Sequence, residues 1–158
     1  MRSATTVDEW AAFYAAESVR LVRFATFVAG PDRALDVVQA AMLRALRAGT
    51  EVHNRRAFVN RIIVREAQRF GEREQRREAL ELRVVPVLDD DDPSEAALPR
   101  PELHAAVRAL SPQQRAVIFH TYWEDLTPSE VARLLGCSEG AVKRQLARAR
   151  AKLREVVR

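Results

Sequence analysis

The sequence predicts an all-α fold of two small helical domains, joined by a flexible acidic linker. Helix-forming Ala, Leu, Arg and Glu abound, whereas only 6% of the 158 residues are aromatic and only 5 are Gly. Charge falls in blocks: 14 arginines against 9 acidic residues over 1–77, 2 against 7 over 78–100, and 10 basic against 6 acidic residues over 101–158. Apolar residues recur at helical spacing in both basic blocks, so each block is predicted to form one domain.

Three helices are predicted in the first domain. The first covers 8–28 and ends at Gly30-Pro31-Asp32, where Asp32 is placed to cap a second helix over 33–47. Residues 49–56 form a loop, and a third helix covers 56–80. Arginines at four-residue steps form a slanting basic stripe on the third helix: Arg61, Arg65, Arg69, Arg73 and Arg77.

Four helices are predicted in the second domain, over 101–109, 112–123, 128–135 and 139–156. The segments Ser111-Pro112-Gln113-Gln114 and Thr127-Pro128-Ser129-Glu130 each combine a cap, a first-turn proline and a capping-box residue. Gly136-Cys137-Ser138 predicts a tight turn before the last helix. Four side chains of the second of these helices are expected mostly in the core, with a surface that meets a partner protein as the alternative for some of them: Val117, Ile118, Tyr122 and Trp123.

Residues 126–153 have the spacing of a helix-turn-helix unit. The first helix should turn Val131, Ala132 and Leu135 inward, and Gly136 supplies a turn conformation that other residues resist. In such units the start of the second helix enters the major groove of DNA. The alternative is a packed helix pair with a solvated basic surface. Six residues are predicted at the DNA-facing end: Ser138, Glu139, Gly140, Lys143, Arg144 and Arg148.

No cluster of residues predicts catalysis, a cofactor, a metal or a small-molecule substrate. The single cysteine, Cys137, excludes an intramolecular disulfide and a multi-cysteine metal site. The three histidines, His53, His104 and His120, lie far apart in the sequence. The first residues lack the layout of a signal peptide and no apolar run reaches membrane length, so we expect a cytoplasmic protein without membrane insertion.

With these motifs in place, the layout resembles the extracytoplasmic-function (ECF, group IV) sigma factors, which keep two conserved helical domains. Residues 106–155 are similar to the family's C-terminal domain, which binds the −35 promoter element. The resemblance implies core RNA polymerase and promoter DNA as partners, and it allows an anti-sigma factor. It also implies promoter-specific transcription initiation, through −35 and −10 recognition and promoter melting.

The first domain carries two further stretches that look like family elements. Residues 34–47 resemble the helix that docks on the polymerase clamp, with matches at Asp36, Val38, Gln39, Leu43 and Arg44. Residues 54–70 resemble the helix that melts and binds the −10 element. The predicted −10 contacts are His53, Asn54, Arg56, Arg61 and Arg65, although Asn54 is equally suited to cap the helix.

The linker 78–100 has 23 residues and reaches about 75 Å when fully extended. Two turns of DNA cover about 70 Å, so both domains could bind one promoter face. The run Asp89 to Asp92 either mimics nucleic acid or is a solubilising spacer. A stand-alone helix-turn-helix regulator and a module that titrates a partner remain alternatives. The clamp-like helix 34–47 separates them, because a plain repressor has no need of it. No constellation supports an enzyme.

Overall fold

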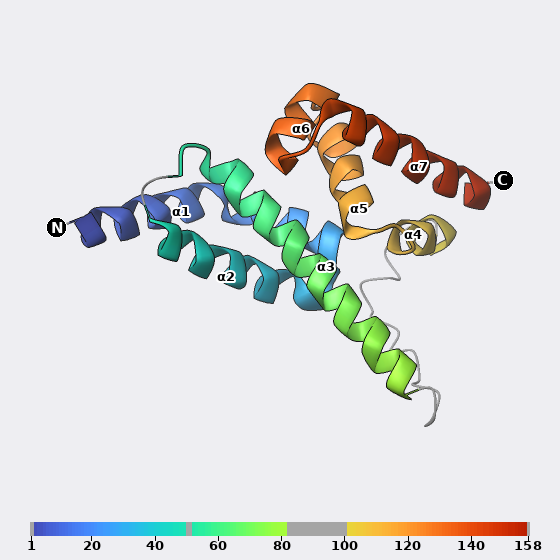
Figure 1. Ribbon diagram of the computed structural model, residues 1–158, viewed down its shortest axis with the longest axis horizontal. Coiled ribbons are helices and arrows are strands. Elements are labelled where there is room, and N and C mark those ends of the chain that lie inside the picture. The colour runs from blue at the N-terminus through green and yellow to red at the C-terminus, as the bar shows by residue number, and fades with distance from the viewer. Residues whose placement is uncertain (1, 50–51, 82–100, 158) are drawn as a thin grey trace.

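The computed structural model describes residues 2–49, 52–81 and 101–157, and every regular element in these ranges is helical (Figure 1). The all-α prediction is therefore confirmed. The first half contains α1 (Arg2–Ala29), α2 (Pro31–Ala48) and α3 (Arg55–Glu81). The second half contains α4 (Pro101–Arg108), α5 (Pro112–Ile118), the π-helical turn η2 (Phe119–Trp123), α6 (Pro128–Leu135) and α7 (Glu139–Val157). Residues 78–81 of the predicted linker belong to α3, and its remainder lies outside the described residues.

The core of the first half forms where α1, α2 and α3 meet. Leu21 and Phe24 of α1 pack with Val37 of α2 and Ile63 of α3, all fully buried. Burial of such side chains contributes roughly 1.5–3 kcal/mol each to folding. The indole of Trp10 is also buried, and its Nε1–H donates to the carbonyl oxygen of Gly49 at 3.1 Å. This bond ties the end of α2 to α1.

The start of α2 differs from the prediction that Asp32 caps it. Gly30, with φ 91°, occupies the cap position and makes no side-chain hydrogen bond, while Pro31 is the first helical residue. Proline suits this position because its missing N–H needs no partner there. Asp32 therefore lies within the first turn, where its negative charge stabilises the positive end of the helix.

Both predicted capping boxes of the second half are present. Ser111 Oγ accepts from the backbone N–H of Gln114 at 3.2 Å, and Gln114 Oε1 accepts from the N–H of Ser111 at 3.1 Å. Thr127 and Glu130 make the same reciprocal pair at 3.3 and 2.8 Å. These contacts satisfy N–H groups that have no partner inside the helix.

The helix predicted over 112–123 changes to a π-helical turn after Ile118. The wider turn is closed by the N–H of Glu124, which donates to the carbonyl of Phe119 at 3.2 Å. Val117 and Ile118 are buried as predicted. Tyr122 and Trp123 are 57% and 69% exposed, so these two lie at the surface and not in the core. The extra residue in the turn rotates them out of the face that packs inward.

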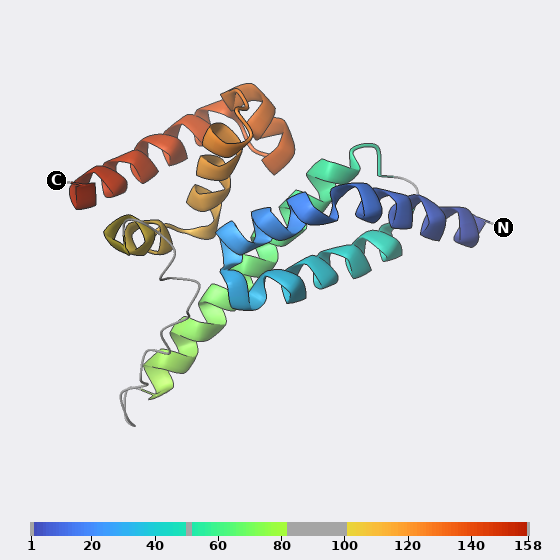
Figure 2. The same cartoon turned by 180° about the vertical axis from the view of Figure 1, so that it is seen from behind.

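The two halves pack on each other mainly where α5 and α6 of the second half meet α1 and α3 of the first (Figure 2). Phe119 of η2 lies 5.2 Å from Phe24 and 5.7 Å from Phe27, measured between ring centroids, and it belongs to the core of the first half. The guanidinium of Arg115 donates to the carbonyl of Val28 at 2.8 Å. Phe119 thus joins the second half of the chain to the core of the first half.

The Thr127 cap should be worth about 1 kcal/mol of stability. Thr127→Ala removes the acceptor for the N–H of Glu130, and we expect the free energy of unfolding in urea to fall by that amount. Thr127→Ser keeps the hydroxyl and should retain most of the stability. Equal losses in both variants would contradict a role for the capping hydrogen bond.

Candidate nucleic-acid interface

The helix-turn-helix is formed by α6 and α7, which meet at Gly136. This glycine has left-handed backbone angles, φ 69° and ψ 38°, and its N–H donates to the carbonyl of Ala132 at 2.9 Å. Val131 and Val142 are fully buried between the two helices. Leu134, rather than the predicted Leu135, is the third buried side chain of α6. Leu135, the next residue of α6, is partly buried. It packs against the core of the first half and against the core of the second half.

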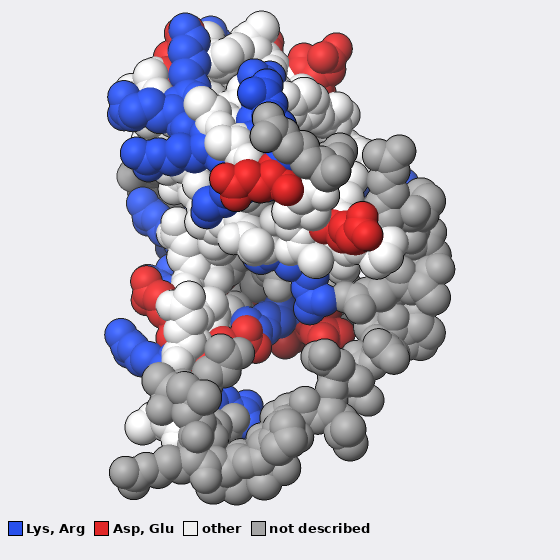
Figure 3. Space-filling model, turned by 90° about the vertical axis from the view of Figure 1, so that its right-hand side faces the viewer, with Lys and Arg blue, Asp and Glu red and all other residues white. Residues whose placement is uncertain are grey.

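The start and exposed flank of α7 carry the six residues predicted to face DNA, and all six are exposed. Ser138 Oγ accepts from the N–H of Ala141 at 3.1 Å, so the predicted cap is present. Lys143 pairs with Glu139 at 3.0 Å one turn earlier. In Figure 3, basic side chains gather along one edge of the upper part of the molecule, where α7 lies. Basic residues that continue along the exposed surface of α7 are Arg144, Arg148, Arg150, Lys152 and Arg154.

At the start of α3, Asn54 is a helix cap. Its Oδ1 accepts from the N–H of Ala57 at 3.0 Å, and its carbonyl accepts from the N–H of Phe58 at 3.0 Å. The side-chain oxygen is therefore engaged by the backbone. His53 is exposed beside it, while Arg56 is only partly exposed.

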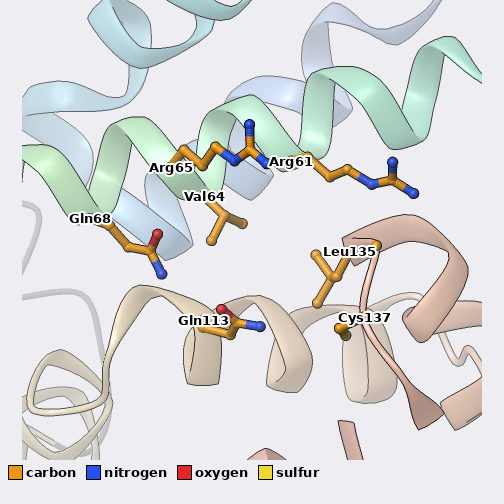
Figure 4. Close-up of a pocket in the computed structure, with 8 residues that line it drawn as sticks. Arg61, Val64, Arg65, Gln68, Gln113, Leu135 and Cys137 are labelled. Carbon is orange, nitrogen blue, oxygen red and sulfur yellow. The ribbon is translucent and has the colours of Figure 1, made fainter. Parts of the chain in front are cut away.

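Arg61 extends from α3 toward α6, whereas the guanidinium of Arg65 stays beside α3 and points away from the second half (Figure 4). Both arginines are exposed. Arg61 Nη2 donates to the carbonyl of Arg133 in α6 at 2.9 Å. Its side chain also lies against Gly136, where a Cβ would come within 2.6 Å of Arg61 Nε. The two arginines line a cavity of about 220 Å³ together with Val64, Gln68, Gln113, Leu135, Gly136 and Cys137. Burial raises the pKa of the Cys137 thiol.

Glu124, just after η2, joins three side chains from both halves of the chain. Its Oε1 accepts a hydrogen bond from Arg20 Nε of α1 at 2.5 Å and forms an ion pair with Arg56 Nη2 of α3 at 2.9 Å. Its Oε2 lies 2.6 Å from Nδ1 of His120, which is fully buried and packs on Phe24. Sequence reasoning missed this cluster, because Arg20 lies 104 positions from Glu124 along the chain.

The cluster shifts the pKa values of both members of the His–Glu pair. Burial lowers the pKa of His120 below its ordinary value, against the opposing effect of Glu124. Burial alone would raise the pKa of Glu124, but hydrogen bonds from His120 and Arg20 lower it to about 2. The arrangement fits a neutral imidazole that donates its Nδ1–H to a carboxylate.

The predicted clamp-binding residues separate into two groups. Asp36, Gln39 and Leu43 are exposed on α2, and Arg44 is partly exposed and pairs with Glu66 at 2.7 Å. Val38 is only 1% exposed and packs in the core of the first half, so its prediction as a contact residue is wrong. Neighbouring apolar residues that are exposed on α2 are Leu35 and Leu46.

Within residues 2–49, 52–81 and 101–157, no three His, Cys, Asp or Glu side chains gather as a metal site would require. None of the described helices is long and apolar enough to cross a membrane.

The His120–Glu124 pair predicts a stability that falls with acidity. The unfolded chain takes up a proton first as the pH falls through 6.5, because folding lowers the pKa of His120 below that value. Glu124 adds a further loss between pH 4.5, its ordinary pKa, and about 2. Measuring the free energy of unfolding in urea at a series of pH values tests both losses of stability.

The variant His120→Gln should flatten the dependence of stability on pH near 6.5. The loss below pH 4.5 should shrink without vanishing, because Arg20 still lowers the pKa of Glu124. The control His53→Gln removes an exposed histidine and should keep the wild-type profile. If the free energy of unfolding of His120→Gln depended on pH near neutrality as strongly as that of the wild type, a group other than His120 would be responsible.

Comparison with known proteins agrees with this geometry. Residues 100–153, which contain the helix-turn-helix, match the family described as "Sigma-70, region 4". The chain is 30% identical over 131 residues to the RNA polymerase sigma-E factor of Streptomyces coelicolor, covering 81% of this chain and 73% of that protein. The same figures hold for the RNA polymerase sigma-E factor of Streptomyces avermitilis. The fold is similar to that of the sigma factor RpoE from Bartonella quintana, solved in complex with the anti-sigma factor NepR, with a TM-score of 0.63, 21% identity, and coverage of 94% of this chain and 96% of that one. This chain thus belongs to the RNA polymerase sigma factors, which direct promoter-specific transcription initiation.

Proposed function

We propose that the chain is a sigma factor of the ECF, group IV, type that works in the cytoplasm without catalytic activity of its own. In this proposal α2 binds the polymerase clamp, α7 binds the −35 element, and the start of α3 binds and melts the −10 element. The observation that carries it is the exposed basic start of α7 in a complete helix-turn-helix unit, on a chain that also has a clamp-like helix.

The −35 contacts are assigned to the start of α7. Ser138 and the free N–H groups of the first turn form a site that suits a phosphate oxygen. Arg144 and Arg148 follow on the same exposed surface, where a guanidinium can donate two hydrogen bonds to a guanine edge. Lys143 shares its charge with Glu139, so it is assigned to backbone contacts rather than to base recognition.

The −10 contacts are assigned to His53, Arg56, Arg61 and Arg65. An unpaired base can leave the stack and bind in a protein pocket once the duplex opens, while arginines neutralise the phosphates. The Asn54 side-chain oxygen is engaged in capping α3, so only its amide N–H groups remain for a base edge.

Clamp binding is assigned to the exposed surface of α2, with Asp36, Gln39, Leu43 and Arg44. Three leucines of this helix are exposed: Leu35, Leu43 and Leu46. Several exposed apolar side chains on one helix indicate a surface that contacts another protein. Val38 supports this surface from beneath. An anti-sigma factor is a further proposed partner, since the structurally similar RpoE is bound to one.

The proposed function is tested by in vitro transcription with purified core polymerase and a promoter library. We expect transcript starts downstream of one shared two-part motif. Duplex DNA binding without defined starts would favour the stand-alone regulator. A chain that bound neither polymerase nor DNA would favour the module that titrates a partner.

A matched pair of variants extends this test to α7. Arg144→Ala should lower transcription by roughly tenfold or more and relax the sequence preference at one −35 position, because a lost base contact costs about 1–3 kcal/mol. The control Arg154→Ala removes the same charge near the other end of α7. It should change the level of transcription only slightly and leave the −35 sequence preference unchanged.

The variant Leu43→Asp should weaken binding to core polymerase by about tenfold or more, since a charge replaces an apolar contact residue. Leu43 is 56% exposed, so the substitution should leave the fold intact. The control Leu80→Asp changes a leucine that is 81% exposed near the end of α3. Fluorescence anisotropy of labelled chain against core polymerase measures both affinities, and equal affinities would remove α2 from the proposed clamp surface.

A further inference from the structure

We infer that Glu66 of α3 is a positioning residue for polymerase binding, because it fixes the side chain of Arg44 on the neighbouring helix α2 before the clamp arrives. The inference rests on the proposed role of α2 as the clamp-binding helix. It adds to that surface a residue that does not itself touch the polymerase.

Glu66 is a carboxylate that is largely removed from solvent. Its side chain is only 12% exposed. Ile62 and Ile63, one turn earlier on α3, belong to the core of the first half, and Phe70, one turn later, packs against it. A charge in such apolar surroundings is tolerated only with close partners, so the position of those partners is strongly constrained.

Two arginines supply these partners, and they come from different helices. Arg44 Nη2 of α2 forms an ion pair with Glu66 Oε1 at 2.7 Å. Arg69, one turn after Glu66 on α3, donates from Nη1 to the same oxygen at 3.4 Å. Since α2 and α3 pack against each other, the carboxylate reaches across their contact to the rim of the clamp-binding surface (Figure 1).

The pairing leaves Arg44 able to bind a second group. Its side chain is 39% exposed, and it lies next to Leu43, the exposed apolar residue of the same surface. A guanidinium has five N–H donors, so contact of one nitrogen with Glu66 leaves donors for an acceptor on the polymerase.

Fixing Arg44 in the free chain should increase the affinity for polymerase. A free arginine side chain has many rotamers, and ordering it on binding has an entropic cost. Arg44 already occupies one position through Glu66, so much of this cost is met when the chain folds. The contribution of Glu66 to binding therefore acts through Arg44 alone.

A purely structural role for Glu66 would have a different signature. If the ion pair only tied α2 to α3, its loss would displace the whole clamp-binding surface, including Leu43. Binding would then weaken whether or not Arg44 were present. A positioning role predicts that the effect of Glu66 disappears together with Arg44, which a double-mutant cycle measures.

The cycle compares Glu66→Gln, Arg44→Ala and the double variant with the wild-type full chain, by fluorescence anisotropy against core polymerase. We expect Glu66→Gln to weaken binding by about threefold to tenfold, as for the loss of one pre-ordered side chain. Arg44→Ala should weaken it at least as much, and the double variant should bind no more weakly than Arg44→Ala.

Two further variants separate positioning from charge and from folding. Glu66→Asp keeps the negative charge on a side chain shorter by one methylene, and it should also weaken binding because the carboxylate no longer reaches Arg44. It also serves as the test variant if circular dichroism shows that Glu66→Gln does not fold.

Arg47 provides the matched control for Arg44. It lies three positions later on α2, it is exposed, and it is not one of the arginines that pair with Glu66 in the described part of the chain. Placed in an Arg47→Ala background, Glu66→Gln should weaken binding by the same factor as in the wild type.

The remaining outcomes overturn either this inference or the function beneath it. An equal loss from Glu66→Gln with and without Arg44 would make Glu66 a structural tie. Tighter binding by Glu66→Gln would mean that the ion pair competes with the polymerase, and it would refute positioning as well. If Arg44→Ala weakened binding and Glu66→Gln did not, only the positioning role would fail. Unchanged affinity of Arg44→Ala would instead remove Arg44 from the proposed clamp surface.

Discussion

The placement of the two halves depends on one carboxylate that is largely removed from solvent. A charge in such a position is tolerated only with close partners, and Glu124 has three: Arg20, Arg56 and His120. Because the arginines belong to α1 and α3, the carboxylate can be satisfied only where those two helices meet. The rest of the interface follows from this requirement, with Phe119 inserted beside the carboxylate and the helix-turn-helix resting on α3.

The π-helical turn η2 makes this placement possible. It turns His120 inward and brings Glu124 back over the first half, and the chain then reverses through Asp125 at φ 56°. The same turn exposes Tyr122, whose hydroxyl accepts from Arg150 Nε of α7 at 2.6 Å. Glu124 and helix α7 are thus joined through a few residues of η2.

The parts that could be predicted from the sequence are those set by local chemistry. The caps at Ser111, Thr127 and Ser138 and the turn at Gly136 depend on neighbours within four residues, and all four were found as expected. The burial of Val38 was missed because its assignment rested on a match to the family sequence pattern. Such a pattern includes both the buried and the exposed positions of an amphipathic helix, so a match alone does not show which of the two a residue occupies. The Glu124 cluster could not be predicted, since its arginines are brought to it only by the packing of the two halves.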